Sequence, residues 1–348
     1  MSLRKTALLV LTVALLFLPK KLLATDNFAT ILIYHRFGDE RYPSTSVSLK
    51  DFRRQMEYLK ENGYNVIHLK ELYNIVSSGK PIPPKTVVIT IDDGYKTTMK
   101  AFKVLKEYGF PFTVFLYLEA VGRYPDFLTK EELKELQLSG LAEFGNHLYS
   151  HPDLAVLRAR LPRERYLRVL EREEELSRKR FKELLKEEPE FLAFPYGSYD
   201  RVSLSFFKKR YKLLLSQDRG SYSGKESPIP RMAVVGSLSS FKRFLQNLKV
   251  EPLPVVNHSP DVGLLKENPV KISFTVEDLK NYENCQIYTS GNGWIKAEKR
   301  GNKVETPFPV KVKKLKTRIG VRCFNKKTRR RAEFFFLVIK KPAPRTGR

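Results

Sequence analysis

The stretch TVVITIDDG, residues 86–94, decides the fold. Its first six residues are apolar or β-branched without polar alternation, which is typical of a strand buried on both faces of a parallel sheet. Asp92 and Asp93 follow where this strand would end, and Gly94 permits a sharp turn there. Active sites of parallel α/β proteins gather at the carboxyl ends of strands, so the two carboxylates mark a candidate site. Taken alone, Asp-Gly equally fits an ordinary surface turn.

Strands and helices alternate along the chain on both sides of this segment. Repeated strand-then-helix units with buried strands predict a parallel sheet, either open or closed into a barrel. Hydrophobic periodicity and capping residues predict strands over 28–34, 66–67, 86–91, 112–118, 142–145, 191–194 and 212–216, and helices over 49–62, 69–76, 96–108, 129–138, 162–187, 203–210 and 239–248.

The pattern changes after about Ser259, where short predicted strands follow one another without helices. The turn signals between them include Gly291-Asn292-Gly293, and their spacing predicts a small all-β, sandwich-like module. These strands are expected over 270–276, 285–290, 294–299, 310–312, 318–324 and 332–339. Proline and glycine recur over 257–269, where we expect the boundary. The predicted units are an N-terminal segment (1–25), an α/β domain (26–258), a basic β-module (265–340) and a basic tail (341–348).

Two histidines stand four residues apart in GNHLYSH, residues 145–151. Imidazoles at this spacing share one face of a helical turn and can bind one metal ion. The alternative is that His147 and His151 are unrelated surface residues, although the chain has only five histidines. Two histidines and one carboxylate, with coordination positions left for water, form a plausible hydrolytic metal site.

Two further segments follow predicted strands. In AFPYG, residues 193–197, a rigid turn at Pro195 and Tyr196 can line a pocket and direct a main-chain N–H into it. In the first strand, His35 follows Tyr34 where the strand would end. Each segment alone is weak evidence, because an ordinary turn or a lone histidine explains it equally well.

Taken together, ITIDDG, GNHLYSH and AFPYG, in this order and at these separations, resemble the NodB-homology polysaccharide deacetylases, carbohydrate esterase family 4. The opening ILIYHRFGD (31–39) and the segment FRRQMEYLKENGYNVIHL (52–69) resemble one branch of that family. In that branch, which includes poly-N-acetylglucosamine deacetylases, the strand bearing the last catalytic motif has moved to the front of the domain. The resemblance covers about residues 31–235. It implies an irregular (β/α) barrel, with fewer than eight repeats, ahead of the β-module.

The resemblance also implies a metal centre. Asp93, His147 and His151 would hold a divalent metal ion, usually zinc, and Asp92 would be the general base that takes a proton from metal-bound water. Such an ion polarises an amide oxygen and lowers the pKa of water. One carboxylate on the metal leaves its neighbour free to act as the base.

The remaining roles implied by the resemblance concern the oxyanion and the leaving amine. The turn at Pro195 would line the substrate site, and the backbone N–H of Tyr196 would help to hold the oxyanion. His35 would protonate the departing amine, a role that suits an imidazole near neutral pH. His258 is the alternative general acid, because it would fit the unpermuted order of the motifs.

The sequence departs from the family pattern at the residue that orients the base. Many relatives carry an arginine two residues before the motif proline, and here that position is Ala193. Arg231, in Pro-Arg-Met (230–232), is the candidate replacement. The segment Gln-Asp-Arg (217–219) fits the family's fourth motif poorly, so we assign it no role, and we expect His68 to be structural.

The N-terminus has the layout of an export signal. Arg4 and Lys5 precede an apolar stretch over 6–19, and Ala24 marks a candidate cleavage site. Fourteen residues is short beside the ~20 that span a membrane, yet an uncleaved anchor and a buried core helix remain alternatives. Export would permit a disulfide between Cys285 and Cys323, and two free thiols are the alternative.

The charge of the chain is strongly positive and unevenly distributed. The net charge is +26, and the segment from Leu264 to Arg348, with 22 basic and seven acidic residues, contributes +15 of it. This excess fits a surface that meets an anionic envelope polymer or a membrane. It equally fits a soluble, thermophile-like composition. Nucleic acid is not expected as a partner of an exported protein.

We therefore predict an exported, metal-dependent polysaccharide N-deacetylase, a hydrolase of linear amide C–N bonds. Its substrate would be the N-acetylglucosamine-type residues of an envelope or extracellular polysaccharide, and its location the periplasm, cell envelope or extracellular space. The alternative is a catalytically silent, glycan-binding envelope protein. Ala193 in place of arginine favours that alternative, whereas the intact metal ligands and the two aspartates argue against it.

Overall fold

The computed structural model describes residues 27–342 of the chain. The predicted export segment (1–25) and residues 343–348 of the predicted tail lie outside the described residues. Among the helices within 27–342, none is both long enough and apolar enough to span a membrane.

A curved parallel sheet forms the centre of the larger domain. Its strand order is β10-β1-β5-β6-β7-β8-β9, and β4 pairs with the start of β5. A parallel bridge between Leu215 and Ile229, just ahead of β10, joins the two ends of this order and closes an irregular barrel. The predicted barrel fold is thereby confirmed. The strands are β1 (Ala29–Tyr34), β4 (Asn65–Val66), β5 (Thr86–Asp93), β6 (Phe112–Leu116), β7 (Ala142–Asn146), β8 (Phe191–Ala193), β9 (Leu213–Leu215) and β10 (Met232–Ala233).

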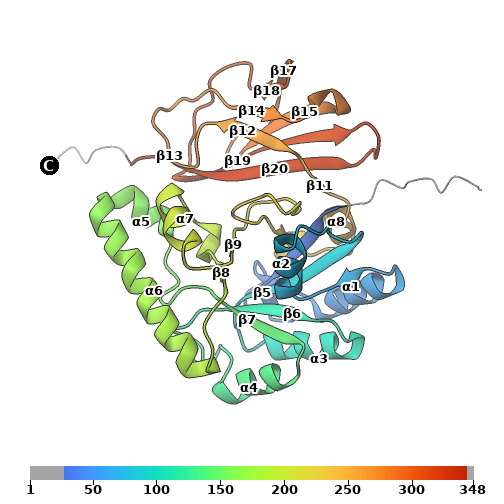
Figure 1. The fold of residues 1–348 in the computed structure, drawn as a ribbon, viewed down its shortest axis with the longest axis vertical. Coiled ribbons are helices and arrows are strands. Elements are labelled where there is room, and N and C mark those ends of the chain that lie inside the picture. Colours follow the sequence, from blue (N-terminus) through green and yellow to red (C-terminus); the bar gives the residue numbers. More distant parts are fainter. Residues whose placement is uncertain (1–26, 343–348) are drawn as a thin grey trace, which may run out of the picture.

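Helices surround this sheet (Figure 1). All eight residues of β5 are buried, as a strand covered on both faces must be. The side chain of Ser48 caps the first helix, and Thr129 with Glu132 forms a capping box at the fourth. The helices are α1 (Leu49–Glu61), α2 (Leu69–Ser77), α3 (Thr98–Tyr108), α4 (Lys130–Leu138), α5 (Leu154–Arg160), α6 (Arg163–Leu185), α7 (Arg201–Lys208) and α8 (Phe241–Asn247), and the short strands β2 (Arg36–Phe37) and β3 (Ser46–Val47) pair beside them.

The C-terminal part of the chain forms two β-sheets around their own hydrophobic core. One sheet has the order β11-β20-β19-β15-β16 with β13 beside β20, and the other has the order β12-β14-β18-β17. β11 lies before the expected boundary at 257–269 and β12 overlaps it. Both strands nevertheless pair with strands of the module. The strand predicted over 310–312 is only an isolated bridge between Val310 and Val270. The strands are β11 (Glu251–Pro252), β12 (Val255–Ser259), β13 (Gly263–Leu264), β14 (Ser273–Val276), β15 (Tyr282–Thr289), β16 (Gly293–Lys296), β17 (Glu298–Arg300), β18 (Lys303–Glu305), β19 (Lys316–Asn325) and β20 (Arg331–Ile339).

A disulfide between Cys285 and Cys323 joins β15 to β19 inside this module. The two cysteines are 38 residues apart, so the bond removes chain entropy from the unfolded state. We expect reduction to lower the free energy of unfolding of the module by about 2–4 kcal/mol. Urea unfolding with and without dithiothreitol measures this effect. A Cys285→Ala/Cys323→Ala variant is the control, because the reductant should leave its midpoint unchanged. Equal midpoints for the oxidised and reduced wild type would refute the prediction.

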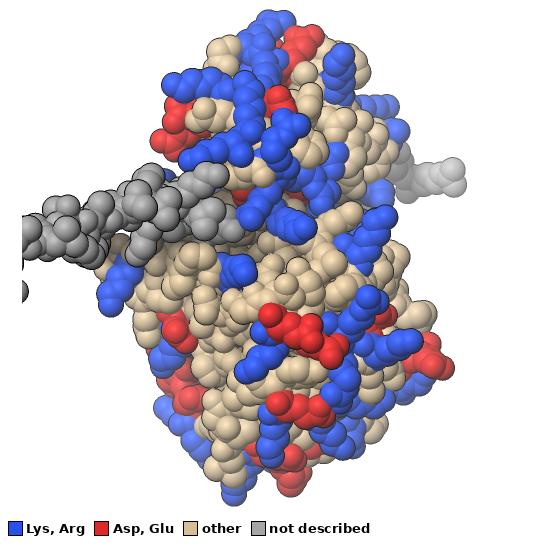
Figure 2. Space-filling model, turned by 90° about the vertical axis from the view of Figure 1, so that its right-hand side faces the viewer, with Lys and Arg blue, Asp and Glu red and all other residues tan. Residues whose placement is uncertain are grey.

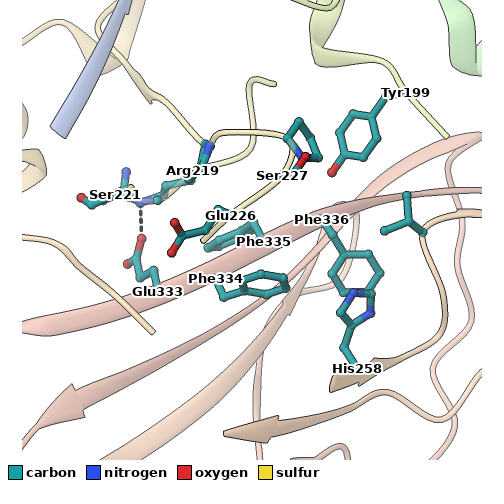
Figure 3. Close-up of a pocket in the computed structure, with 14 residues that line it drawn as sticks. Tyr199, Arg219, Ser221, Glu226, Ser227, His258, Glu333, Phe334, Phe335 and Phe336 are labelled. Carbon is teal, nitrogen blue, oxygen red and sulfur yellow. Dashed lines mark hydrogen bonds and ion pairs between the residues drawn. The ribbon is translucent and has the colours of Figure 1, made fainter. Parts of the chain in front are cut away.

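The module lies directly on the barrel, with β19 and β20 nearest to it (Figure 1). Arg219 of the barrel donates to the carboxylate of Glu333 on β20, as the dashed line in Figure 3 shows. The hydroxyl of Tyr199 accepts a hydrogen bond from the backbone N–H of Leu337, whose side chain joins the hydrophobic cluster beneath α7. Lys316 on β19 binds Asp153 at the start of α5. These contacts place the module against the loops that follow β8 and β9.

Candidate active site

Four of the predicted site segments meet at one end of the barrel. His35 follows β1, Asp92 and Asp93 end β5, His147 follows β7, and the turn at Tyr196 follows β8. All of these strands are parallel, so their carboxyl ends open onto the same face of the barrel. The local motifs are therefore brought together by the topology of the sheet.

Asp92 forms a fully buried ion pair with Arg231. The two guanidinium nitrogens lie 2.7 and 2.8 Å from the two carboxylate oxygens. Arg231 also donates from Nε to the carbonyl of Ser216 at 2.8 Å and from Nη1 to Thr90 Oγ1 at 3.1 Å. Burial favours the neutral form of Asp92, but the positive charges of Arg231 and His147 outweigh burial and hold the pKa of Asp92 below its ordinary value. The carboxylate is thus both ionised and fixed in orientation.

Arg231 reaches Asp92 from the segment that closes the barrel, just ahead of β10. Ala193, at the position where many relatives carry an arginine, is buried in the hydrophobic cluster that also holds Phe115. The guanidinium of Arg231 lies 5.6 Å from the ring of Phe115, so it enters the same barrel interior from the segment ahead of β10. The structure thus places an arginine beside the aspartate although the motif position lacks one.

Asp93, His147 and His151 form the group of residues that could bind a metal ion. Asp93 Oδ1 lies 3.4 Å from His147 Nε2 and 3.1 Å from His151 Nε2, and one ligand atom of each residue lies within 4.8 Å of the others. The left-handed backbone of Asp93 (φ 73°), followed by Gly94, turns this carboxylate toward the histidines. Burial opposes ionisation of Asp93, but the close imidazole rings of His147 and His151 hold its pKa well below the ordinary value.

Two features of this cluster fit a divalent cation. Asp93 Oδ1 and His147 Nε2 are buried and lack a hydrogen-bond partner in the described part of the chain. His147 Nδ1 lies 2.7 Å from the carbonyl of Ala193, which fixes the ring so that Nε2 faces the aspartate. A buried carboxylate oxygen and two imidazole nitrogens converging on one point match the ligands of a catalytic zinc site.

His35 and Tyr196 border the metal-ligand cluster. Burial lowers the pKa of His35, and the charges of Asp93 and Asp92 offset only part of this effect. The ring of Tyr196 lies 4.6 Å from the ring of His151 and is 49% exposed, which places it at the mouth of the site. Tyr196 has a left-handed backbone (φ 58°), an uncommon conformation for a residue other than glycine.

The β-module supports the turn that contains Tyr196. Arg318 on β19 donates from Nη2 to the carbonyls of Tyr196 and Gly197, at 3.3 and 3.2 Å, and from Nε to Asp218 at 2.9 Å. Asp218 in turn accepts a hydrogen bond from the hydroxyl of Tyr199. Residues 217–219 were assigned no role from the sequence, because nothing in their local pattern connects Asp218 with an arginine 100 residues away.

His258, the alternative general acid, is not brought to this cluster. It lies on β12, which pairs with β14 inside the module. Its ring stacks on that of Phe336 at 4.0 Å (Figure 3). Its Nδ1 lies 2.9 Å from the carbonyl of Pro260. The pairing of β12 with β14 thus places His258 among the aromatic rings of the module, and its role as the alternative general acid stays a prediction. His68 lies at the N-terminus of α2, 3.8 Å from the carboxylate of Glu143, in keeping with a structural role.

Comparison with known proteins agrees with the motifs and the fold. The polysaccharide deacetylase family model matches residues 79–210. The chain is 28% identical over 244 residues to the poly-beta-1,6-N-acetyl-D-glucosamine N-deacetylase of Staphylococcus aureus strain MRSA252, covering 62% of this chain and 82% of that protein.

Two solved structures share the fold. IcaB from Ammonifex degensii matches with a TM-score of 0.53 and 25% identity, over 61% of this chain and 93% of that one. The Streptococcus pyogenes deacetylase PplD, in complex with acetate, matches with a TM-score of 0.55 and 22% identity, over 64% of this chain and 98% of that one. With the three motifs meeting at one end of the barrel, these matches support a NodB-type polysaccharide deacetylase of carbohydrate esterase family 4, similar to the branch that includes poly-N-acetylglucosamine deacetylases.

Proposed function

We propose that the protein is a metal-dependent hydrolase that removes N-acetyl groups from N-acetylglucosamine-type residues of a polysaccharide. One observation carries this proposal: an ionised, oriented carboxylate, Asp92, adjoins a separate carboxylate that faces two histidines. The first carboxylate is free to accept a proton, because its neighbour Asp93 belongs to the ligand group.

The residues of the chain divide the reaction among them. A divalent ion held by Asp93, His147 and His151, which we propose to be Zn²⁺, would supply Lewis acidity toward the acetamide oxygen and the attacking water. Asp92, held by Arg231, accepts the proton of the attacking water. The backbone N–H of Tyr196 stabilises the developing oxyanion, and Pro195 fixes the turn that presents it.

The leaving amine needs a proton, and we assign that step to His35. This assignment is supported by the place of His35 directly after β1, where the charges of Asp93 and Asp92 act on it, whereas His258 stacks on Phe336 of the module. An imidazole can exchange protons near neutral pH, as a general acid must.

The substrate class follows from relatives and from chemistry. The staphylococcal relative is named for poly-beta-1,6-N-acetyl-D-glucosamine, and the streptococcal deacetylase was solved with acetate, which is the acid released by deacetylation. We propose the same acetamide chemistry here. The apolar segment 6–19 supports export of the protein to the periplasm, cell envelope or extracellular space.

Acetate release from N-acetylglucosamine oligomers tests this function. The full chain is assayed with added Zn²⁺ and with a chelator, and we expect the chelator to abolish release and added Zn²⁺ to restore it. His35→Ala should lose activity, whereas the matched variant His258→Ala should keep it. Release that survives complete metal removal, or an equal loss in both histidine variants, would contradict the proposal.

The alternative of a silent glycan-binding protein is not favoured by the geometry. That alternative rested on Ala193 in place of arginine. Arg231 supplies a bidentate guanidinium to Asp92 from another segment, so the base does not lack its partner.

A further inference from the structure

A cleft of about 400 Å³ lies between the barrel and the β-module. Arg231, which binds Asp92, and Arg318, which binds the carbonyl of Tyr196, both line it. The cleft therefore shares two residues with the groups that hold the proposed reaction centre. When the acetamide of one sugar lies at Asp92, the neighbouring sugars of the polysaccharide must lie against the protein surface nearby. This cleft is next to Arg231 and Arg318 and could bind them.

Strand alternation builds the module wall of this cleft. Along β19, Ile319 and Val321 are buried in the module core, whereas Arg318 and Arg322 point to the opposite face, toward the barrel. Trp294 on β16 lies on the same wall, with its ring 3.9 Å from the guanidinium of Arg322, and it remains 37% exposed. The wall thus combines cationic groups with an exposed aromatic ring.

The cleft carries positive charge that the protein does not neutralise. Three of the six arginines that line it, namely Arg243, Arg322 and Arg331, are bonded to no carboxylate anywhere in residues 27–342. The other three have carboxylate partners, in the pairs Arg219–Glu333, Arg231–Asp92 and Arg318–Asp218. Basic side chains also dominate the module and its junction with the barrel in Figure 2. Clustered like charges are unfavourable unless an anion binds between them.

Arg322 shows the strongest need for such an anion. Its Nε is buried and has no hydrogen-bond partner, and its Nη2 donates only to the neutral side chain of Gln286 at 2.7 Å. Burial lowers the pKa of Arg322; the charge of Glu333 opposes this shift, and the charges of Arg331 and Arg219 add to it. A buried guanidinium nitrogen without an acceptor costs free energy that a bound carboxylate or phosphate would recover.

We propose that this cleft binds an anionic group, a carboxylate or a phosphate, carried by the polysaccharide close to the N-acetylated sugar that is hydrolysed. This inference rests on the proposed function, which supplies the reaction. The anionic character of the ligand is inferred from the arginines of the cleft. It predicts that the substrate is an anionic N-acetylated polysaccharide rather than a neutral one. Deacetylation creates an ammonium group, which the same arginines repel, so the charge of the cleft favours release of product.

The single tryptophan of the chain gives a direct readout of this cleft. Because the protein has one Trp, Trp294, its fluorescence reports binding at this wall. The full chain, with metal removed to prevent turnover, is titrated with a hyaluronan hexasaccharide, which carries carboxylates, and with a neutral chitin hexasaccharide. A phosphodiester-linked N-acetylglucosamine oligomer separates phosphate from carboxylate recognition. We expect at least one anionic oligomer to bind about tenfold more tightly than the neutral one, with an affinity that falls as salt is raised.

A charge-matched pair of variants locates the effect. Arg243→Gln/Arg322→Gln should weaken anionic binding about tenfold or more and leave neutral binding unchanged. Arg165→Gln/Arg168→Gln, which removes the same charge from the exposed side of α6, should change neither. Equal affinity of the wild type for anionic and neutral oligomers, or an equal loss with both oligomers in the cleft variant, would overturn the inference. Acetate release from the anionic and neutral oligomers, measured with metal present, tests the proposed function separately. No release from any of them would count against the proposed function, whereas equal binding of them without metal would count against the cleft.

Discussion

Replacing Arg231 by methionine is expected to destabilise the protein by about 3–5 kcal/mol, because it leaves Asp92 as a buried charge without a partner. Both side chains are fully buried and meet at 2.7 and 2.8 Å. The carboxylate would also lose the contacts that orient it, so kcat should fall together with stability. Urea unfolding and acetate release measure the two effects.

A double-mutant cycle separates the loss of stability caused by the unpaired buried charge from the loss caused by poorer packing. Arg231→Met/Asp92→Asn removes both charges, so it should be more stable than Arg231→Met alone. Arg231→Lys keeps a positive charge but not the two parallel hydrogen bonds, and should be intermediate. If the double variant were no more stable than Arg231→Met, the cost would lie in packing, and the ion-pair argument would fail.

The ion pair of Asp92 and Arg231 also predicts how the free energy of unfolding depends on pH. The pKa of Asp92 is lowered in the folded protein, so the stability it contributes is present above its unfolded pKa and is lost as pH falls through the folded value. In Arg231→Met we expect burial to raise the pKa of Asp92. The contribution of this carboxyl to the free energy of unfolding then increases as pH falls. The stability gap between wild type and Arg231→Met should therefore narrow on acidification.

The sequence predicted the parts of the site that are local in the chain. Asp92 and Asp93 are recognisable because a buried, β-branched strand precedes them. His147 and His151 are recognisable by their spacing, although the segment that carries them is a loop with left-handed backbone at Leu148 and His151 rather than the helical turn that was expected. A parallel sheet brings the carboxyl ends of its strands to one edge, whatever the conformation of the connecting loops. For this reason the barrel and the metal-ligand cluster could be predicted without knowledge of any long-range contact.

The parts that depend on packing between distant segments were harder to predict. Arg231 is 139 residues from Asp92, and its role appears only when the segment ahead of β10 closes the barrel. Arg318 is 122 residues from Tyr196, and it reaches that turn only because β19 faces the barrel. His258 resembled a site residue because the sequence does not show that its strand pairs with β14. Periodicity records which face is buried but not which partner buries it.

Replacing Asp92 by asparagine is expected to lower kcat about 10²–10⁴-fold, the usual contribution of a general base. Asparagine has nearly the same shape but cannot accept the proton of the attacking water. Asp93, His147 and His151 are untouched, so metal content should remain at the wild-type level. Acetate release and metal analysis of the purified full chain measure the two properties.

Asp93→Asn is the matched control for this substitution. It makes the same chemical change at the adjacent residue, whose Oδ1 faces both histidines, so it should lose bound metal as well as activity. Wild-type turnover in Asp92→Asn, or loss of metal in both variants, would mean that the two carboxylates do not divide the roles as proposed. Activity lost with metal retained only in Asp92→Asn would instead establish that one aspartate moves the proton while its neighbour holds the ion.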